Sequence, residues 1–167
     1  TAITSRLAAK QRPLAVTLMY RHPDLGKGSL LESFSLNAPR PRGLWKNRTL
    51  PHSFLEQRPQ HLVSNATTFF FLGSLNGRYT VEAFSRVQGR RLWTLPLPPS
   101  TEPAVFAPLV PVGTGVAVLV RDQGSLMKLR HRVLAVDGKT GKVRWKHSLW
   151  LPSFRRPWAV RGQLLFP

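Results

Sequence analysis

The residue types that catalyse reactions and bind metals are few in this chain, and they lie far apart in it. General acid–base catalysis and Ca²⁺ binding each need several carboxylates together, and no such group is visible. The chain has no cysteine, which excludes disulfides, thiolate metal sites and cysteine nucleophiles. The seven acidic residues stand singly, at Asp24, Glu32, Glu56, Glu82, Glu102, Asp122 and Asp137.

Histidines offer no better basis for chemistry. They show no metal-ligand spacing and no local signature that joins them to a serine and an aspartate, so we expect each of them at the surface or in a loop. They are His22, His52, His61, His131 and His147. The sequence therefore predicts no catalytic residue, no metal site and no cofactor, in a protein that is not an enzyme.

Basic residues are abundant instead. The 167 residues include 25 Lys and Arg against seven Asp and Glu, which gives a formal net charge of +18. Ion pairing within the chain cannot neutralise such an excess, so we expect an acidic partner: nucleic acid, an anionic membrane or an acidic protein lattice.

Some of the cations are arranged in strips. In residues 142–146, strand alternation is expected to put the three basic side chains on one face and to bury Val143 and Trp145 on the other. Strips of this kind contact phosphates without reading bases. The predicted polyanion-binding residues are Arg86, Arg90, Arg91, Lys142, Arg144, Lys146, Arg155 and Arg156.

The elements that position these residues are short strands. Hydrophobic residues make up 42% of the chain and predict a packed core, whereas 15 Pro and 12 Gly predict many turns. The longest uncharged run, residues 103–120, is broken by prolines and glycines, so it favours two strands over a transmembrane segment. We expect strands at 14–20, 30–36, 43–45, 61–64, 67–72, 79–86, 90–95, 104–112, 116–121, 131–136, 142–149 and within 157–166.

The strand pattern repeats along the chain. A slide of 52 residues aligns Val81 with Val133, Ala83 with Ala135, Phe84 with Val136, Gly89 with Gly141 and Trp93 with Trp145. A weaker match falls 48 residues earlier, with Trp45 beneath Trp93 and Leu36 beneath Phe84, but Pro41 stands where a glycine is expected. We count about three units of roughly four strands each.

One hairpin of the repeat, residues 133–145, contains residues with clear structural roles. Asp137 can accept backbone N–H groups within its turn, Thr140 supports that turn, and Gly141 supplies the positive φ that closes a bulged hairpin. Trp145 then offers a large flat surface for burial between adjacent sheets.

The spacing Ala135-x-Asp137-x-x-Thr140-Gly141-x-x-x-Trp145 resembles the tryptophan-docking motif of the quinoprotein-type (pyrroloquinoline-quinone-like) β-propeller repeat. The upstream copy keeps part of it in Ala83, Gly89 and Trp93, while Ser85 and Gln88 replace the Asp and Thr. The resemblance covers residues 61–167 well and residues 14–60 poorly. It implies an all-β fold, a partial β-propeller of about three four-stranded antiparallel blades; a β-sandwich of irregular hairpins is the alternative.

Some members of that family bind a quinone cofactor and Ca²⁺ and oxidise alcohols or sugars. This chain departs from them because three blades make about half a ring, adjacent cysteines are missing and the acidic residues stand singly. The resemblance therefore carries over the fold without the cofactor or the activity.

These features predict a basic N-terminal arm at residues 1–13 and a propeller-like domain at 14–167, with blades at about 14–60, 61–100 and 101–150 and the start of another at 151–167. We expect a non-catalytic structural or adaptor subunit that docks through its basic surface on an acidic polymer, first of all RNA in a ribonucleoprotein such as an organellar ribosome, with other protein subunits covering its open blade faces. This function favours an organelle such as the mitochondrion.

Two other functions fit the same residues. In the first, the chain is a fragment of an extracytoplasmic quinoprotein-like propeller used for protein–protein interaction, in which the glycosylation tripeptides at Asn47 and Asn65 would make sense. In the second, it is a basic subunit on an acidic protein lattice such as microtubules.

Overall fold

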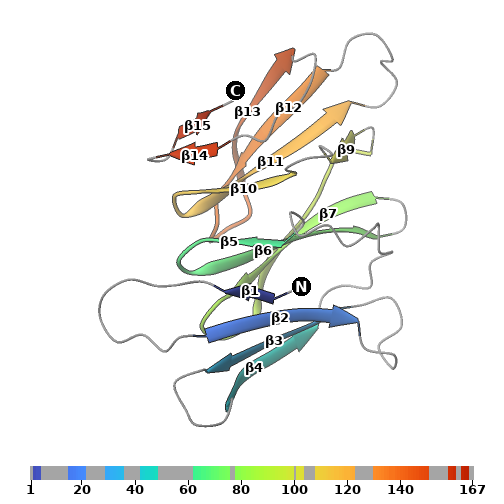
Figure 1. Ribbon diagram of the computed structural model, residues 1–167. Helices are drawn as coiled ribbons and strands as arrows, with labels where there is room; N and C mark the ends of the chain where they lie inside the picture. The colour runs from blue at the N-terminus through green and yellow to red at the C-terminus, as the bar shows by residue number, and fades with distance from the viewer. Residues whose placement is uncertain are drawn as a thin grey trace.

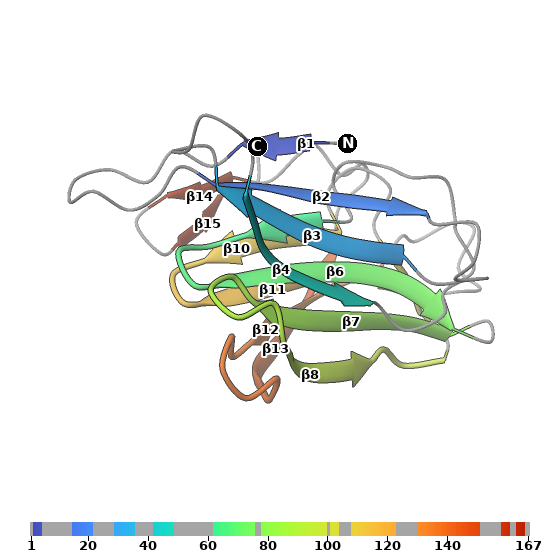
Figure 2. The same cartoon turned by 90° about the horizontal axis from the view of Figure 1, so that it is seen from below.

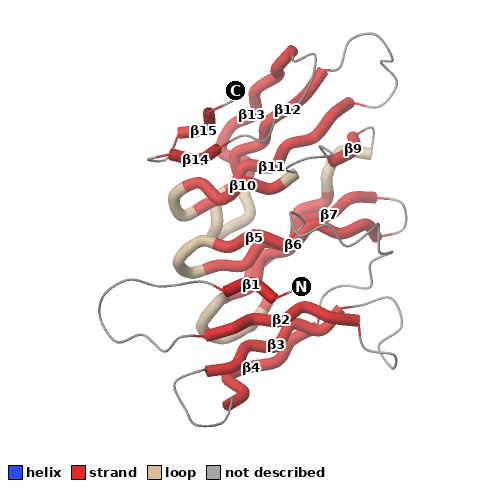
Figure 3. Tube along the Cα trace, in the orientation of Figure 1, coloured by secondary structure: helices blue, strands red, loops and turns tan. Residues whose placement is uncertain are grey.

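The computed structural model describes residues 2–4, 15–21, 29–35, 42–48, 62–75, 78–99, 101–103, 108–122, 130–150, 158–160 and 163–165. Every regular element in these ranges is a β-strand, so the expectation of an all-β chain is confirmed (Figure 3). All strand pairs are antiparallel.

The first sheet has four strands in sequence order. These are β1 (Ala2–Thr4), β2 (Ala15–Arg21), β3 (Ser29–Ser35) and β4 (Arg42–Arg48). The strand β1 comes from the segment in which we expected a basic arm, and its residues pair with Val16–Leu18 of β2.

The second sheet repeats this order. Its strands are β5 (Leu62–Ser64), β6 (Thr68–Leu75), β7 (Arg78–Ser85) and β8 (Arg91–Pro96). The third sheet contains β10 (Leu109–Val112), β11 (Gly115–Asp122), β12 (Arg130–Val136) and β13 (Val143–Trp150) in the same order, with β9 (Thr101–Pro103) added beside β11. The strand β9 is not among the strands that the sequence predicts.

A last pair, β14 (Trp158–Val160) and β15 (Gln163–Leu165), follows the third sheet, and β14 contacts β10. The three larger sheets stack face to face in chain order, from β1–β4 through β5–β8 to β10–β13 (Figure 1). Seen from below, their strands run in successive layers (Figure 2). The outer strands β4, β8 and β13 each end their sheet.

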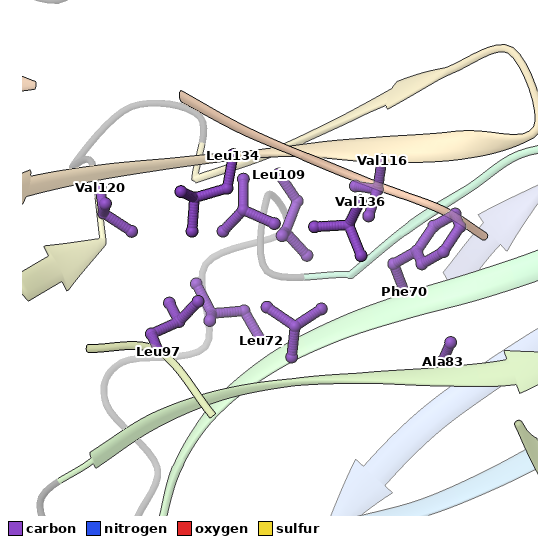
Figure 4. Close-up of a cluster of buried hydrophobic side chains, with 11 residues drawn as sticks. Phe70, Leu72, Ala83, Leu97, Leu109, Val116, Val120, Leu134 and Val136 are labelled. Atoms are coloured by element: carbon purple, nitrogen blue, oxygen red, sulfur yellow. The ribbon is translucent and has the colours of Figure 1, made fainter. Parts of the chain in front are cut away.

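The largest apolar cluster fills the space between the second and third sheets (Figure 4). Phe70, Leu72 and Ala83 point into it from the second sheet, and Val116, Val118, Val120, Leu134 and Val136 from the third. The strand β11 contributes β-branched residues to a position covered on both sides, which is where a continuous apolar run is favoured.

The phenylalanine run in β6 is buried on both faces. Phe70 points into the cluster just described, whereas Phe69 and Phe71 pack with Leu62, Phe84 and the partly buried Trp45 on the side of the first sheet. All three phenylalanines have less than 5% of their surface exposed. This strand therefore links two inter-sheet cores.

Two expectations about single residues were wrong. His131 lies within β12 and is buried rather than in a loop. In the first sheet, Phe34 and not Leu36 holds the position of Phe84, because both follow the small residue that pairs with the tryptophan. The first hairpin is two residues longer between these points than the second, so a uniform slide of the sequence misaligned it.

Candidate docking interface

Each of the three sheets carries the same β-bulge at the same place. The register shifts by one residue after Ser33, Ala83 and Ala135, and each of these small residues pairs directly with a tryptophan of the outer strand. A bulge opposes two residues to one, which bends the strand and re-aims the side chains that follow it. The tryptophans are Trp45, Trp93 and Trp145.

Two of these tryptophans dock on the turn of the next sheet. The Trp45 indole N–H donates to the carbonyl oxygen of Arg86 at 2.9 Å, and the Trp93 indole N–H donates to that of Gly138, also at 2.9 Å. In both cases the ring lies against the glycine that follows the acceptor residue by three positions: Trp45 against Gly89, and Trp93 against Gly141. A Cβ at Gly141 would lie 2.7 Å from Cδ2 of Trp93, and one at Gly89 would overlap the Trp45 ring.

The glycines are required for a second reason. Gly89 has a φ of 67° and Gly141 a φ of 71°, in the left-handed region that other residues adopt at a cost. The same residue thus closes the turn and gives the indole ring a flat backbone to pack on. Sheet-to-sheet contact and turn geometry depend on one position.

Hydrogen bonds hold each acceptor turn in shape. Oδ1 of Asp137 accepts the N–H groups of Lys139 and Thr140 at 2.9 Å each and the Thr140 hydroxyl at 3.1 Å. Oδ2 of Asp137 accepts from Nε of Arg144 at 3.0 Å and forms an ion pair with its guanidinium group. In the preceding sheet Ser85 holds the turn with a single bond of this kind, because its Oγ accepts the N–H of Gln88 at 3.1 Å.

The contacts of Asp137 favour its ionised form. The hydrogen bond from the Arg144 side chain, followed by those from the backbone of Thr140 and Lys139, holds the pKa of this carboxyl well below its usual range. The turn therefore keeps its charged acceptor throughout the neutral range.

The third tryptophan is exposed, which corrects our expectation that Val143 and Trp145 form a buried strip. Trp145 has 51% of its surface exposed and Val143 has 43%. The bulge is one cause, because it sets Val143 and Arg144 together against Val136 and breaks strict alternation. The other is that, among the described residues, no glycine turn faces Trp145.

The face around Trp145 is nevertheless built like the faces that are covered. Trp145 pairs with Ala135 as Trp93 pairs with Ala83. On the same sheet, Val110, Ala117, Leu119 and Val133 form a separate apolar cluster. The strand β14 contacts β10, at the opposite edge of the sheet from β13. None of the described strands outside the third sheet is placed against its outer end, where Trp145 is 51% exposed.

Three of the predicted polyanion-binding residues hold partners within the chain. Arg86 is half-buried, and its Nη1 donates to the carbonyl oxygen of Asn65 at 2.7 Å. Its guanidinium group lies 5.2 Å from the centre of the Phe69 ring. Burial lowers the pKa of Arg86. Arg91 pairs with the buried Glu82 at 3.2 Å, and Arg144 pairs with Asp137. Arg90, Lys142 and Lys146 are exposed, while Arg155 and Arg156 lie outside the described residues.

Several residues of the interface were not found from the sequence. The carbonyl groups of Arg86 and Gly138 accept the indole N–H groups, and Nδ2 of Asn47 donates to the carbonyl oxygen of Gly89. Backbone acceptors have no residue-type signal, so the only sequence clue was the common spacing from each glycine to its tryptophan. The small partner Ser33 could have been found by comparing it with Ala83 and Ala135.

The described part of the chain contains neither a cluster of metal-ligating side chains nor a membrane-spanning helix. No group of three or more His, Cys, Asp or Glu side chains there could hold a metal ion. No helix there is long and apolar enough to cross a membrane.

The docking geometry predicts the effect of adding one methyl group. Gly141→Ala should lower the free energy of unfolding by roughly 2 to 4 kcal/mol, because the left-handed conformation and the displaced Trp93 ring both cost energy. Gly113→Ala is the matched control: it also has a positive φ of 55°, but a Cβ there meets nothing within 4 Å, so about 1 kcal/mol is expected. Denaturant unfolding of both variants measures the difference, and equal losses would contradict the packing role of Gly141.

The lowered pKa of Asp137 predicts a pH dependence. A carboxyl whose pKa is lowered by folding stabilises the fold above its unfolded pKa of about 3.9 and loses that contribution as pH falls further. The stability advantage of the parent chain over Asp137→Ala should therefore be constant from about pH 5 to 8 and shrink below about pH 4. In an Arg144→Ala background the effect of Asp137→Ala should depend less on pH, because the backbone hydrogen bonds to Asp137 remain but the contact with Arg144 is lost. A difference unchanged down to about pH 2 would contradict the assignment.

Comparisons with known proteins agree with this architecture. No protein-family model and no curated protein matches the chain. Among solved structures, a protein described as a europium-containing methanol dehydrogenase superposes with a TM-score of 0.52 over 80% of this chain, at 17% sequence identity. The chain covers 23% of the length of that chain. The likeness shows a distant quinoprotein-like fold, and the expected partial β-propeller of about three four-stranded antiparallel blades is confirmed.

Proposed function

We propose that this chain is a section of a larger quinoprotein-like β-propeller and works through protein–protein docking at the open face of its third sheet. The observation that carries the proposal is Trp145. Two equivalent tryptophans dock on a glycine turn of the next sheet, whereas Trp145 has 51% of its surface exposed. Large exposed apolar groups set in an apolar sheet face mark interaction sites.

The occupant of this face is a further blade-type hairpin. It must present a glycine with positive φ under the indole ring and a backbone carbonyl three residues earlier, as Gly141 and Gly138 do for Trp93. The sequence of the first hairpin disfavours a second copy of this chain as the occupant. There the equivalent position is Pro41, whose ring fixes a negative φ.

We propose a docking role without catalysis. Its support is that three carboxylates are engaged in ion pairs: Glu32 with Lys46 at 2.9 Å, Glu82 with Arg91, and Asp137 with Arg144. Each pair joins two strands, or a turn and a strand, of one sheet. Carboxylates held in this way support the fold.

Docking on an acidic polymer, with RNA first, is the second candidate. It is favoured by the net charge of +18 and by the exposed Arg90, Lys142 and Lys146. Against it, three of the predicted contact residues, Arg86, Arg91 and Arg144, already hold partners within the chain. This candidate requires that RNA bind at low salt and be released as salt rises.

The docking proposal can be tested by supplying the missing turn. A chain extended after residue 167 by a copy of residues 130–150 would add two outer strands, with their glycine turn, behind β14 and β15. Its melting temperature should rise by about 4 °C or more, because Trp145 becomes buried between sheets. The rise should be lost when Trp145→Ala is introduced in the parental part.

The control is the same extended chain with Gly141→Val in the appended copy only. It keeps the length and the added strands but removes the surface that accepts the indole ring. If both extended chains melt at the same temperature, the docking proposal is wrong.

A further inference from the structure

A groove of about 490 Å³ lies between the second and third sheets, and Trp145 is the one residue of its lining that the docking proposal also uses. Residues 95–98, in and just after β8, line it together with residues 143–146 of β13, and Arg132 and Leu134 of β12 complete it. The groove therefore runs between the outermost strands of two neighbouring sheets. It is separate from the place where Trp93 docks on Gly141.

The floor of the groove is aliphatic. Leu97 and Leu134 belong to the core cluster between the two sheets and are 3% and 7% exposed, and the half-buried Leu95 packs against that cluster. An apolar side chain placed here would extend the existing core, which is the usual source of affinity in a cleft.

The rim of the groove is positively charged. Three of its ten lining residues, Arg132, Arg144 and Lys146, are basic and none is acidic. Lys146 pairs across the ladder with Leu134, and Arg132 lies two residues from Leu134 along β12, so both share the face that forms the floor. Arg144 is paired with Asp137, whereas Lys146 is exposed and has no ion-pair partner among the described residues.

The backbone along the groove is suited to an extended chain. The strand β13 ends its sheet, so half of its N–H and C=O groups point outward from the sheet edge. On the opposite wall, Pro96 and Pro98 offer no N–H group. An added strand would therefore pair with β13 and pack its side chains against β8.

From these three features we infer that the groove binds an extended acidic peptide in which apolar and acidic residues alternate. Its apolar side chains would enter the floor at Leu95, Leu97 and Leu134. The acidic side chains beside them would reach the basic rim at Lys146 and Arg132. A nucleic acid would use the rim but has no aliphatic groups for the leucine floor, so the peptide is favoured.

The test uses the whole chain and a fluorescein-labelled peptide of about eight residues that alternates glutamate and leucine. Fluorescence anisotropy should show saturable binding, weakened about fivefold or more by Lys146→Glu, because the variant sets like charges together. Arg78→Glu, the same charge reversal at an exposed residue outside the groove, should change the affinity by less than about twofold. A peptide alternating glutamate and serine should bind at least about fivefold more weakly than the glutamate–leucine peptide.

Three results would overturn the inference. One is the absence of binding of the glutamate–leucine peptide. Another is equal weakening by Lys146→Glu and Arg78→Glu, which would show attraction by net charge alone. The third is an oligouridylate of similar length that binds as tightly and is equally sensitive to Lys146→Glu, which would assign the groove to nucleic acid. Trp145 also lines the groove, but the melting test of the docking proposal uses no peptide, so the two proposals can fail separately.

Discussion

The contact between an indole ring and a left-handed glycine is the constraint on which the stacking of these sheets depends. A four-stranded sheet that is apolar on both faces is stable only when both faces are covered. Trp45 and Trp93 provide that cover on the outer strands β4 and β8, and each donates one hydrogen bond to the backbone of the next sheet. The glycine beneath each ring must be a glycine for two reasons at once, its φ and its missing Cβ. Because the same packing recurs between sheets, the same glycine-to-tryptophan spacing recurs in the sequence.

The fold was predictable from the sequence to the extent that local chemistry determines it. The strands, the turn around Asp137 and the repeat of Gly89 and Trp93 at Gly141 and Trp145 could all be read from residue types and spacing. What could not be read was how the sheets meet. The indole N–H groups of Trp45 and Trp93 find backbone carbonyls, which every residue has, and the bulge that re-aims Trp145 cancels the simple alternation on which a buried strip was predicted. The groove floor combines Leu95 and Leu97 with Leu134 from another sheet, so no local pattern could show it.

Charge illustrates the same difference between composition and position. A net charge of +18 is a property of the whole chain, and it predicted an acidic partner without saying where that partner lies. The structure commits Arg86, Arg91 and Arg144 to contacts within the molecule, two of them with carboxylates. Lys146 is different because it stands beside an apolar groove, where a single cation can add specificity to burial. The Trp145 face would therefore bind through aromatic packing, whereas the groove would combine aliphatic burial with contacts to basic side chains.

The most direct test of the central claim is hydrogen exchange at the tryptophan indole N–H groups of the unmodified chain, followed by NMR of ¹⁵N-labelled tryptophan with assignments from single Trp→Phe variants. Exchange reports the free energy needed to break each hydrogen bond. The indole N–H groups of Trp45 and Trp93 should exchange at least about tenfold more slowly than that of Trp145, because the first two are bonded to the next sheet and the third awaits its partner. Equal exchange at all three positions would contradict the account.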